Sequence, residues 1–231
     1  MLTGANGFLG KYLYETLKKN NFIVTKFDCD IRKIKSFPTG HFDFILHLAS
    51  LITHRDKYSL EELEDVNVRG TKNLTSCYPS TKIIYSSTKD VYRKTLSDYA
   101  KSKVEAERYI KKNPNNLIVR IPSLFGPNQK QKSKLIPRLF DKYIYNQNFE
   151  LRNNELREYI YVEEASKFFL DKLSLTGTID MNGYKILNSR VDTIISSICK
   201  NKEIVLKDED ERRIHHYLNI MHNEIIINDA Y

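Results

Sequence analysis

The stretch Thr3-Gly-Ala-Asn-Gly-Phe-Leu-Gly10 places three glycines just ahead of an amphipathic pattern. Such a turn lets the backbone approach a pyrophosphate, which the N–H groups of the following helix then bind. The spacing alone is weak evidence, because an ordinary strand-to-helix turn has the same glycines. Asp28 strengthens the evidence for a dinucleotide site, because this residue ends the next apolar run. A carboxylate at that position accepts hydrogen bonds from an adenosine ribose. The sequence therefore predicts a site for NAD, while Arg32 and Lys33 keep NADP open.

Apolar runs and helical patterns alternate through the first half of the chain. Helical periodicity follows the glycine turn and recurs over Ser59–Leu74 and Asp98–Lys112. Four short apolar runs predict buried parallel strands: Phe22–Phe27, Phe42–Leu48, Lys82–Tyr85 and Leu117–Ile121. Strands that alternate with helices of this length indicate βαβ units. We expect an α/β fold, a Rossmann-like, doubly wound parallel sheet.

The rhythm changes after Pro127, where strands become short and scattered. Helices are expected at 135–145, 163–173 and 193–199, and strands at 178–181, 185–187, 203–206 and 224–227. This half predicts a small C-terminal α+β cap built on the end of the sheet. We expect residues 1–127 to form the NAD(P)-binding core and residues 128–231 a substrate-binding cap that is intertwined with it.

The basic charge balance does not by itself identify a partner. The chain carries 37 Lys+Arg against 29 Asp+Glu, with a net charge of +8 and a pI near 9.2. The charges are scattered, and the local clusters Lys111-Lys112 and Lys130–Lys134 lack the interleaved aromatics of a nucleic-acid platform. A solvated Lys-rich surface is the favoured interpretation, and a nucleic-acid partner is not expected.

Other compositional features indicate a cytoplasmic protein. No run approaches 18 apolar residues, so no membrane span is expected, and the N-terminus lacks the pattern of a signal peptide. Cys29, Cys77 and Cys199 are widely spaced and odd in number. This argues against a disulfide framework and a metal cluster, and for a reducing compartment.

A second constellation points to proton transfer. Tyr85-Ser-Ser-Thr88 ends a predicted strand, and Tyr99-Ala-Lys-Ser-Lys103 follows on a predicted helix. Tyr99 and Lys103, four residues apart, share one helix face. An ammonium beside the phenol, together with an oxidised nicotinamide, would lower the tyrosine pKa toward neutrality. The tyrosinate could then take a proton from a substrate hydroxyl as hydride leaves the same carbon. The alternative without function is that Tyr99 and Lys103 are simply two neighbouring side chains on the surface of a helix.

Taken in order, these motifs resemble the extended short-chain dehydrogenase/reductase superfamily, in its NAD-dependent epimerase/dehydratase branch for nucleotide sugars. Beyond the glycine turn and the Tyr/Lys pair, the segments that carry the resemblance are Asp28, Asp30-Ile31, His47-Leu-Ala-Ser50, Asn67-Val-Arg-Gly-Thr71, Ser86–Tyr92, Arg120-Ile-Pro-Ser-Leu-Phe-Gly-Pro127 and Arg157–Glu164. They cover roughly residues 1 to 190 in the expected order.

The resemblance implies a role for each matching residue. The catalytic set is Tyr99 as acid/base, Lys103, and Thr88, with Ser86 or Ser87 as substitutes. The implied cofactor-binding set is Gly4, Asn6, Gly7, Phe8, Leu9, Gly10, Asp28, Asp30, Ile31, Leu48, Ala49, Ser50, Asn67, Tyr99, Lys103, Ile121 and Pro122. Ser123 and Arg157 are implied on the substrate, Arg157 at the nucleotide diphosphate. The resemblance also implies a homodimer through the helices near Asn67–Cys77 and Tyr99–Lys112, and no metal.

Three departures separate this chain from the family pattern. Only Met1-Leu2 precede the glycine turn, so either the true start lies upstream or the first strand is a stub. The helix and strand between Asp28 and His47 are nearly absent, so Asp30-Ile31 could serve alone as the third strand. Thr88 and Tyr99 are 11 residues apart, whereas relatives have a longer loop there that closes over the sugar.

Two functions therefore stay open. The first is an NAD(P)-dependent nucleotide-sugar epimerase or 4-keto reductase; a dehydratase is disfavoured because Lys89 stands beside Asp90, where an acid pair is expected. The second is a degenerate, non-catalytic dinucleotide-binding module with a regulatory or scaffold role. Two further residues, Glu105 and Glu107, are expected on a solvated helix face or a dimer surface, and His47 is expected to act through its backbone.

Overall fold

The computed structural model describes residues 1–52, 58–129, 134–151 and 154–229. The chain forms two compact units, and each is described by itself. One contains Met1–Pro122 and Glu163–Met181, and the other contains Ser123–Val162 and Asn182–Tyr231. The chain thus leaves the first unit, returns to it and leaves again. Of the basic cluster Lys130–Lys134, positions 130–133 lie outside the described residues.

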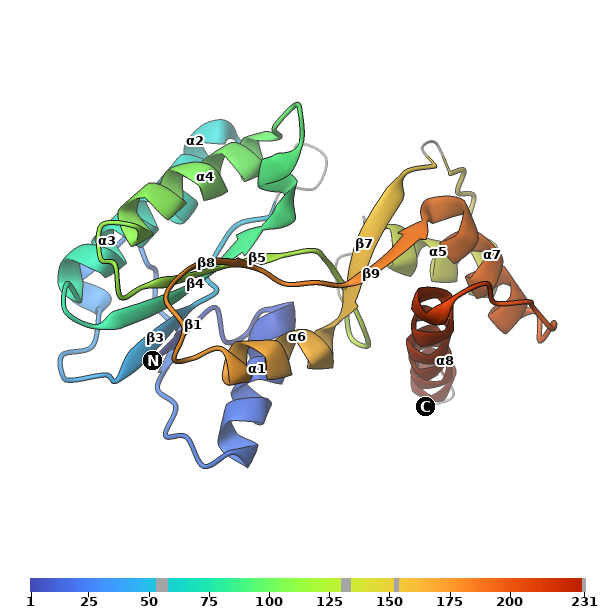
Figure 1. The fold of residues 1–231 in the computed structure, drawn as a ribbon, viewed down its shortest axis with the longest axis horizontal. Coiled ribbons are helices and arrows are strands. Elements are labelled where there is room, and N and C mark those ends of the chain that lie inside the picture. The colour runs from blue at the N-terminus through green and yellow to red at the C-terminus, as the bar shows by residue number, and fades with distance from the viewer. Residues whose placement is uncertain (53–57, 130–133, 152–153, 230–231) are drawn as a thin grey trace. The chain divides into compact units, whose positions relative to one another are not determined.

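The first unit is built on a six-stranded parallel sheet (Figure 1). Its strands are β1 (Leu2–Thr3), β2 (Lys26–Phe27), β3 (Phe44–His47), β4 (Lys82–Thr88), β5 (Leu117–Ile121) and β8 (Gly177–Asp180). They lie in the order β2-β1-β3-β4-β5-β8, and every neighbouring pair is parallel. From Ile83 to Thr88 every residue of β4 is buried, as expected for a central strand covered on both faces.

Helices cover both faces of this sheet, which makes it doubly wound (Figure 1). On one face lie α1 (Phe8–Lys19) and α6 (Val162–Asp171), joined by a hydrogen bond of 2.9 Å between the Thr16 and Ser166 hydroxyls. The other face carries α2 (Leu60–Leu63), α3 (Gly70–Cys77) and α4 (Asp98–Ile110). A π-helical turn, Glu64–Arg69, joins α2 to α3 without a break. The predicted Rossmann-like architecture is confirmed.

The sheet is shorter at its β2 edge than the sequence indicates. Of the predicted strand Phe22–Phe27 only the last two residues pair, because the neighbouring β1 offers just two residues; Ile23 is 99% exposed. The expectation that Asp30-Ile31 forms a third strand is wrong. Asp30 instead closes a turn, in which the backbone N–H of Arg32 donates to its carboxylate. A short 3₁₀ turn, Ile34–Ser36, fills the rest of this connection.

The second unit packs three helices on a three-stranded sheet. The sheet order is β6 (Ser123–Phe125), β7 (Leu156–Tyr161), β9 (Tyr184–Leu187), with β6 parallel and β9 antiparallel to β7. The helices are α5 (Leu135–Ile144), α7 (Asn188–Cys199) and α8 (Glu209–Asp229). Aromatic and aliphatic side chains from all six elements form one core cluster.

Two predicted strands of this second half are wrong. Residues 202–207 form no strand: Ile204 and Leu206 pack against the core, but within the described part of the chain no strand pairs with them. The run Glu224–Ile227 lies inside α8, where Ile214, Leu218 and Met221 bury one helical face. Strands β6 and β7 were not predicted, since each mixes polar and apolar residues.

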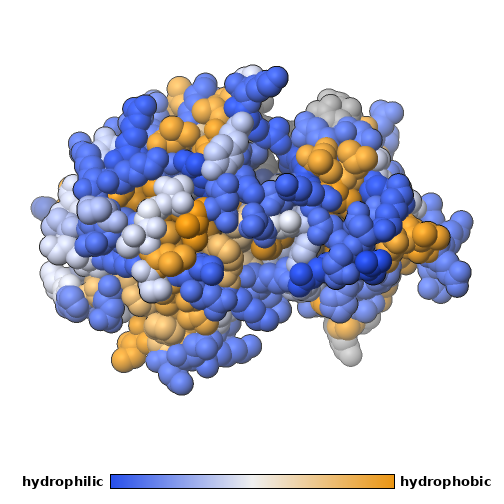
Figure 2. Space-filling view, viewed as in Figure 1, coloured by the Kyte–Doolittle hydropathy of each residue, from blue (hydrophilic) through white to orange (hydrophobic). Residues whose placement is uncertain are grey.

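Hydrophilic residues are spread over the visible face, with apolar residues exposed between them (Figure 2). Within the described ranges, no helix combines the length and apolar character needed to cross a membrane.

Candidate active site

The residues predicted for cofactor and catalysis in the first unit gather at one edge of its sheet. The glycine turn follows β1, Asp28 follows β2, Leu48 follows β3, and Thr88 and Ile121 end β4 and β5 as partners in register. The carboxyl ends of parallel strands lie at the same edge, where doubly wound folds bind their ligands. The geometry therefore brings these residues together.

The glycine turn is shaped by close backbone packing. Gly4 has a left-handed φ of +68°, and a Cβ there would lie 2.7 Å from the Ala49 nitrogen; a Cβ on Gly10 would overlap the Gly4 carbonyl oxygen. Gly7 is different, because its Cβ would meet only that oxygen, at 3.1 Å. Gly7 also starts α1 without a capping side chain, and the first turn of α1 carries no acidic residue. The N–H groups at the start of α1 fit a pyrophosphate.

Asp28 is exposed beside this turn, and its carboxylate accepts a hydrogen bond of 3.0 Å from the Asn6 amide. No ion pair to Asp28 occurs among the described residues, so its second oxygen suits ribose hydroxyls. The nearby Arg32 is engaged elsewhere, with ion pairs of 2.7 Å to Asp30 and 3.2 Å to Asp65. Hydrogen bonds from Arg32 lower the pKa of Asp30 to about 2. This arrangement removes one cation that could have recognised the 2′-phosphate of NADP.

The segment after β3 is held by buried polar side chains. The His47 ring lies between two hydroxyls, with Nδ1 2.8 Å from Thr3 Oγ1 and Nε2 2.9 Å from Thr71 Oγ1. Asn67, in the π-helical turn, accepts hydrogen bonds from Ser50 Oγ and the Leu51 N–H, at 3.1 and 2.7 Å. The Asn67 amide also donates to Ser102 Oγ on α4, at 2.9 Å. A π-helical turn often marks a functional site; here it ties this segment to the helix of Tyr99 and Lys103.

Other predicted cofactor residues vary in burial. Leu9 and Ile31 are buried, and Ile31 packs against Gly70, where a Cβ would lie 2.5 Å from the isoleucine Cγ2. Phe8 and Pro122 are half-buried, and Ile121 is buried. Their contacts with a cofactor stay predictions.

Tyr99 and Lys103 lie on successive turns of α4. Ser97 caps the start of this helix, because its hydroxyl accepts from the Ala100 N–H at 3.2 Å. Thr88 ends β4, and its hydroxyl accepts from the Asp90 N–H at 3.1 Å, which caps the 3₁₀ turn Lys89–Tyr92. α4 packs on β4 and on this turn. The shortened Thr88–Tyr99 connection thus still places the tyrosine helix beside the end of β4.

Burial dominates the proton affinities of this pair. Lys103 is 1% exposed, and burial lowers its pKa to about 7, a change that the Glu107 carboxylate opposes. Burial, with the charge of Asp90, raises the pKa of Tyr99 above its usual value. The protein's own groups therefore shift the tyrosine in the direction opposite to the one expected for catalysis. The positive charge of an oxidised nicotinamide is the contribution that this expectation requires.

The serines of β4 differ in their availability. Ser86 donates to the His47 carbonyl oxygen at 3.2 Å, and Ser87 donates to Glu107 at 2.7 Å. Glu107 is 2% exposed and forms a two-pronged pair with Arg120 on β5, at 2.7 and 3.0 Å. The expectation that Glu107 lies on a solvated face is wrong. Its spacing four residues after Lys103 is the signal that could have placed it on the buried side of the helix.

Ser123 and Arg157 both lie in the sheet of the second unit. Ser123 pairs in register with Tyr159, and Arg157 precedes Tyr159 by two residues on β7. Arg157 is half-buried and pairs with Glu155 at 3.4 Å. Their role toward substrate stays a prediction.

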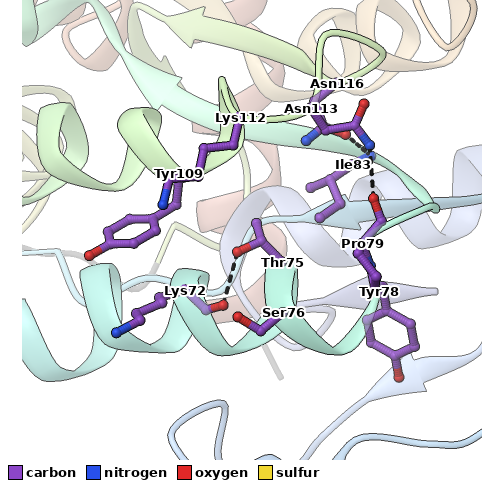
Figure 3. A pocket seen from close by; sticks show the side chains of 10 residues that line it. All are labelled: Lys72, Thr75, Ser76, Tyr78, Pro79, Ile83, Tyr109, Lys112, Asn113 and Asn116. Atoms are coloured by element: carbon purple, nitrogen blue, oxygen red, sulfur yellow. Dashed lines mark hydrogen bonds between the residues drawn. The ribbon is translucent and has the colours of Figure 1, made fainter.

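A pocket of about 300 Å³ lies elsewhere, where α3 and α4 end. Its lining includes Lys72, Thr75, Tyr109, Lys112 and Asn113 (Figure 3). It also includes Ile83, near the start of β4, so the pocket lies at the opposite edge of the sheet from Thr88. None of the predicted site residues lines it. The expected dimer surface on these helices stays a prediction.

With this geometry in place, comparison with known proteins identifies the family. The model of the NAD-dependent epimerase/dehydratase family matches residues 1–174. The chain belongs to this family. The resemblance and the NAD cofactor expected from the glycine turn and Asp28 are thereby confirmed. No curated protein matches the chain.

Solved structures of epimerases and dehydratases share the fold of this NAD-dependent epimerase/dehydratase family member. The NAD-dependent NDP-hexosamine 5,6-dehydratase TunA is 17% identical, with a TM-score of 0.80 over 97% of this chain and 96% of that one. Thermus thermophilus UDP-glucose 4-epimerase in complex with NAD is 16% identical, with 0.78 over 97% and 98%. Bacillus cereus UDP-N-acetylglucosamine 4-epimerase is 20% identical, with 0.74 over 96% and 95%. These likenesses show the fold.

Proposed function

We propose that this chain is an NAD-dependent enzyme that oxidises or reduces a sugar carbon of a nucleotide sugar, as an epimerase or a 4-keto reductase. The observation that carries the proposal is the position of Tyr99 and Lys103 on α4, packed beside the hydroxyl-bearing end of β4 at the carboxyl edge of the sheet. The neighbours that share this fold include epimerases of UDP-sugars, which supports the substrate class.

Each residue has a distinct task in this mechanism. Thr88 orients the reacting oxygen of the sugar, and Tyr99 takes the proton from that hydroxyl. NAD, when bound, supplies the acceptor for the hydride that leaves the same carbon. Lys103 favours the tyrosinate while its ammonium is charged, and it holds the nicotinamide ribose. In the reducing direction Tyr99 returns the proton to the carbonyl oxygen.

Binding of both ligands would use the flanking residues. The N–H groups at the start of α1 receive the pyrophosphate, and Asp28 receives the adenosine ribose. Arg157 receives the substrate diphosphate, for which a guanidinium is well suited. In this proposal the first unit binds the cofactor, and Arg157 of the second unit is a residue proposed for the substrate.

A non-catalytic dinucleotide-binding module is the second candidate. The observation that favours it is the raised pKa of Tyr99, because burial and Asp90 both oppose the tyrosinate. The short Thr88–Tyr99 connection also favours the non-catalytic module, because it is shorter than the loop that closes over the sugar in relatives. The two candidates differ in turnover, so kinetics separate them.

The test is Tyr99→Phe, with Tyr109→Phe on the same helix as the matched control. Turnover of a UDP-, GDP-, CDP- or dTDP-sugar, found by screening the wild-type chain with NAD, should fall about 100- to 10,000-fold in Tyr99→Phe, because a positioned general base is lost. Calorimetry should show NAD binding retained in both variants. Wild-type chain that binds NAD and turns over no member of the panel would favour the non-catalytic module.

A further inference from the structure

The buried ammonium of Lys103 lies over an aromatic ring. Its Nζ is 4.2 Å from the centroid of the Tyr85 ring, and each of the two side chains is 1% exposed. Tyr85 lies on β4, directly under the helix that carries Lys103. A desolvated ammonium over the face of a ring is attracted by the negative charge density of that face.

This ring is the main direct partner of the ammonium. No hydrogen bond of Lys103 Nζ occurs among the described residues. Glu107, one turn further on α4, attracts the ammonium through space, but its oxygens are already occupied by Arg120, Ser87 and Lys111. On the β3 side, the neutral His47 ring stands 5.3 Å from the Tyr85 ring, and Tyr99 is the titratable group one turn before Lys103.

We propose that Tyr85 is a positioning residue whose ring face holds the Lys103 ammonium in place for Tyr99 and the nicotinamide ribose. This inference rests on the proposed function for the roles of Tyr99 and Lys103. It assigns Tyr85 a task that its hydroxyl does not perform. The Tyr85 hydroxyl is buried and has no well-formed hydrogen bond to a described residue.

The ring has an electrostatic consequence for the lysine. Burial pulls the pKa of Lys103 down to about 7. Loss of the ring face would disfavour the charged form further, so a smaller fraction of Lys103 would carry the ammonium charge that attracts tyrosinate and ribose. The carboxylate of Glu107 alone would then oppose neutralisation.

The experiment titrates Lys103 in the cofactor-free protein, so it does not depend on turnover. Protein labelled with ¹³C at the lysine Cε carbons is followed by NMR from pH 5 to 10, and Lys103→Met identifies the signal. Tyr85→Leu removes the ring, and Tyr85→Phe keeps it. Tyr85→Met is a second ring-free variant in case the leucine variant does not fold. Ile83→Ala, two residues earlier on β4, is the control for a cavity in the strand.

The ring-free variants should lower the Lys103 titration midpoint by about 1.5 pH units, the shift that corresponds to a desolvated cation–π contact. Tyr85→Phe and Ile83→Ala should titrate as the wild type does, and the pH profile of NAD affinity should shift with the midpoint. An unchanged or raised midpoint in the ring-free variants overturns the inference, as does a shift in Tyr85→Phe equal to theirs. If Lys103 shifts as expected but no sugar nucleotide is turned over, the proposed function fails and the contact stands.

Discussion

Lowering the pH from 7.5 to 5.0 should destabilise the first unit through His47. This side chain is completely buried, and burial together with the nearby Lys103 charge lowers its pKa from the usual 6.5 to about 3. The hydrogen bonds fix its tautomer. The Thr71 hydroxyl donates to the Asn67 carbonyl oxygen, so Thr71 Oγ1 accepts from His47 Nε2–H, and Nδ1 is the acceptor for Thr3.

The sign and the size follow from this depressed pKa. Below pH 6.5 His47 binds a proton in the unfolded chain but stays neutral in the folded chain. The contribution of neutral His47 to the free energy of unfolding is therefore fully present above pH 6.5 and is lost as the pH falls toward 3. Each pH unit within this window costs about 1.4 kcal/mol, so pH 5.0 should cost about 2 kcal/mol relative to pH 7.5.

The assay compares urea unfolding, followed by far-UV circular dichroism, at the two pH values and constant ionic strength. His47→Gln keeps a side chain that donates and accepts but cannot charge, so its acid-induced loss should be smaller by about 2 kcal/mol. His41→Gln changes an exposed histidine and should behave as the wild type does. Equal acid-induced losses in wild type and His47→Gln would refute the reasoning, even if the variant is less stable at both pH values.

Three further predictions concern the glycine turn, the ribose carboxylate and the buried ion pair. Gly10→Ala should lower the free energy of unfolding by roughly 1–3 kcal/mol because its Cβ overlaps backbone. Gly7→Ala brings its Cβ only to 3.1 Å from the Gly4 carbonyl oxygen, so it should lose less stability than Gly10→Ala, and it should bind NAD more weakly in calorimetry. Asp28→Ala should weaken NAD more than NADP; a wild-type chain that already prefers NADP would contradict this. Glu107→Gln should lower the free energy of unfolding in urea by roughly 3 kcal/mol, because the Arg120 guanidinium loses its charged partner. If the double variant with Arg120→Gln lost the full sum of the two single effects, that result would contradict the pairing.

The parts of the fold that depend on local pattern could be predicted from the sequence. The apolar runs of β3, β4 and β5 and the helix that follows Ser97 were placed correctly, because burial on both faces leaves a continuous apolar signal. The strand predicted at 22–27 is longer than the observed β2, because the length of a strand is set by its partner and β1 supplies only two residues. Residues 203–206 alternate as a strand would, but they pair with no strand among the residues that the structure describes.

The candidate site shows the same division. Tyr99, Lys103 and the glycines follow from spacing, because a helix face and a turn are local geometry. Glu107 was misplaced because a charged residue is rarely buried unless paired, and the pairing with Arg120 joins two segments that are distant in sequence. The ring of Tyr85 under Lys103 is likewise a contact between elements, which no local pattern reports.

Because the first unit is made of two separate segments of the chain, it cannot complete its fold until the second segment has been synthesised. The ribosome releases β1 to β5 first and then the residues from Ser123 to Val162, before α6 and β8 emerge to complete the first unit. Until then the edge of β5 that later receives β8 is bare, and an unpaired edge is a template for wrong pairing between chains. From Ile121 to Asp180 about 60 further residues are translated before β8 completes the sheet, a period of several seconds at ordinary elongation rates.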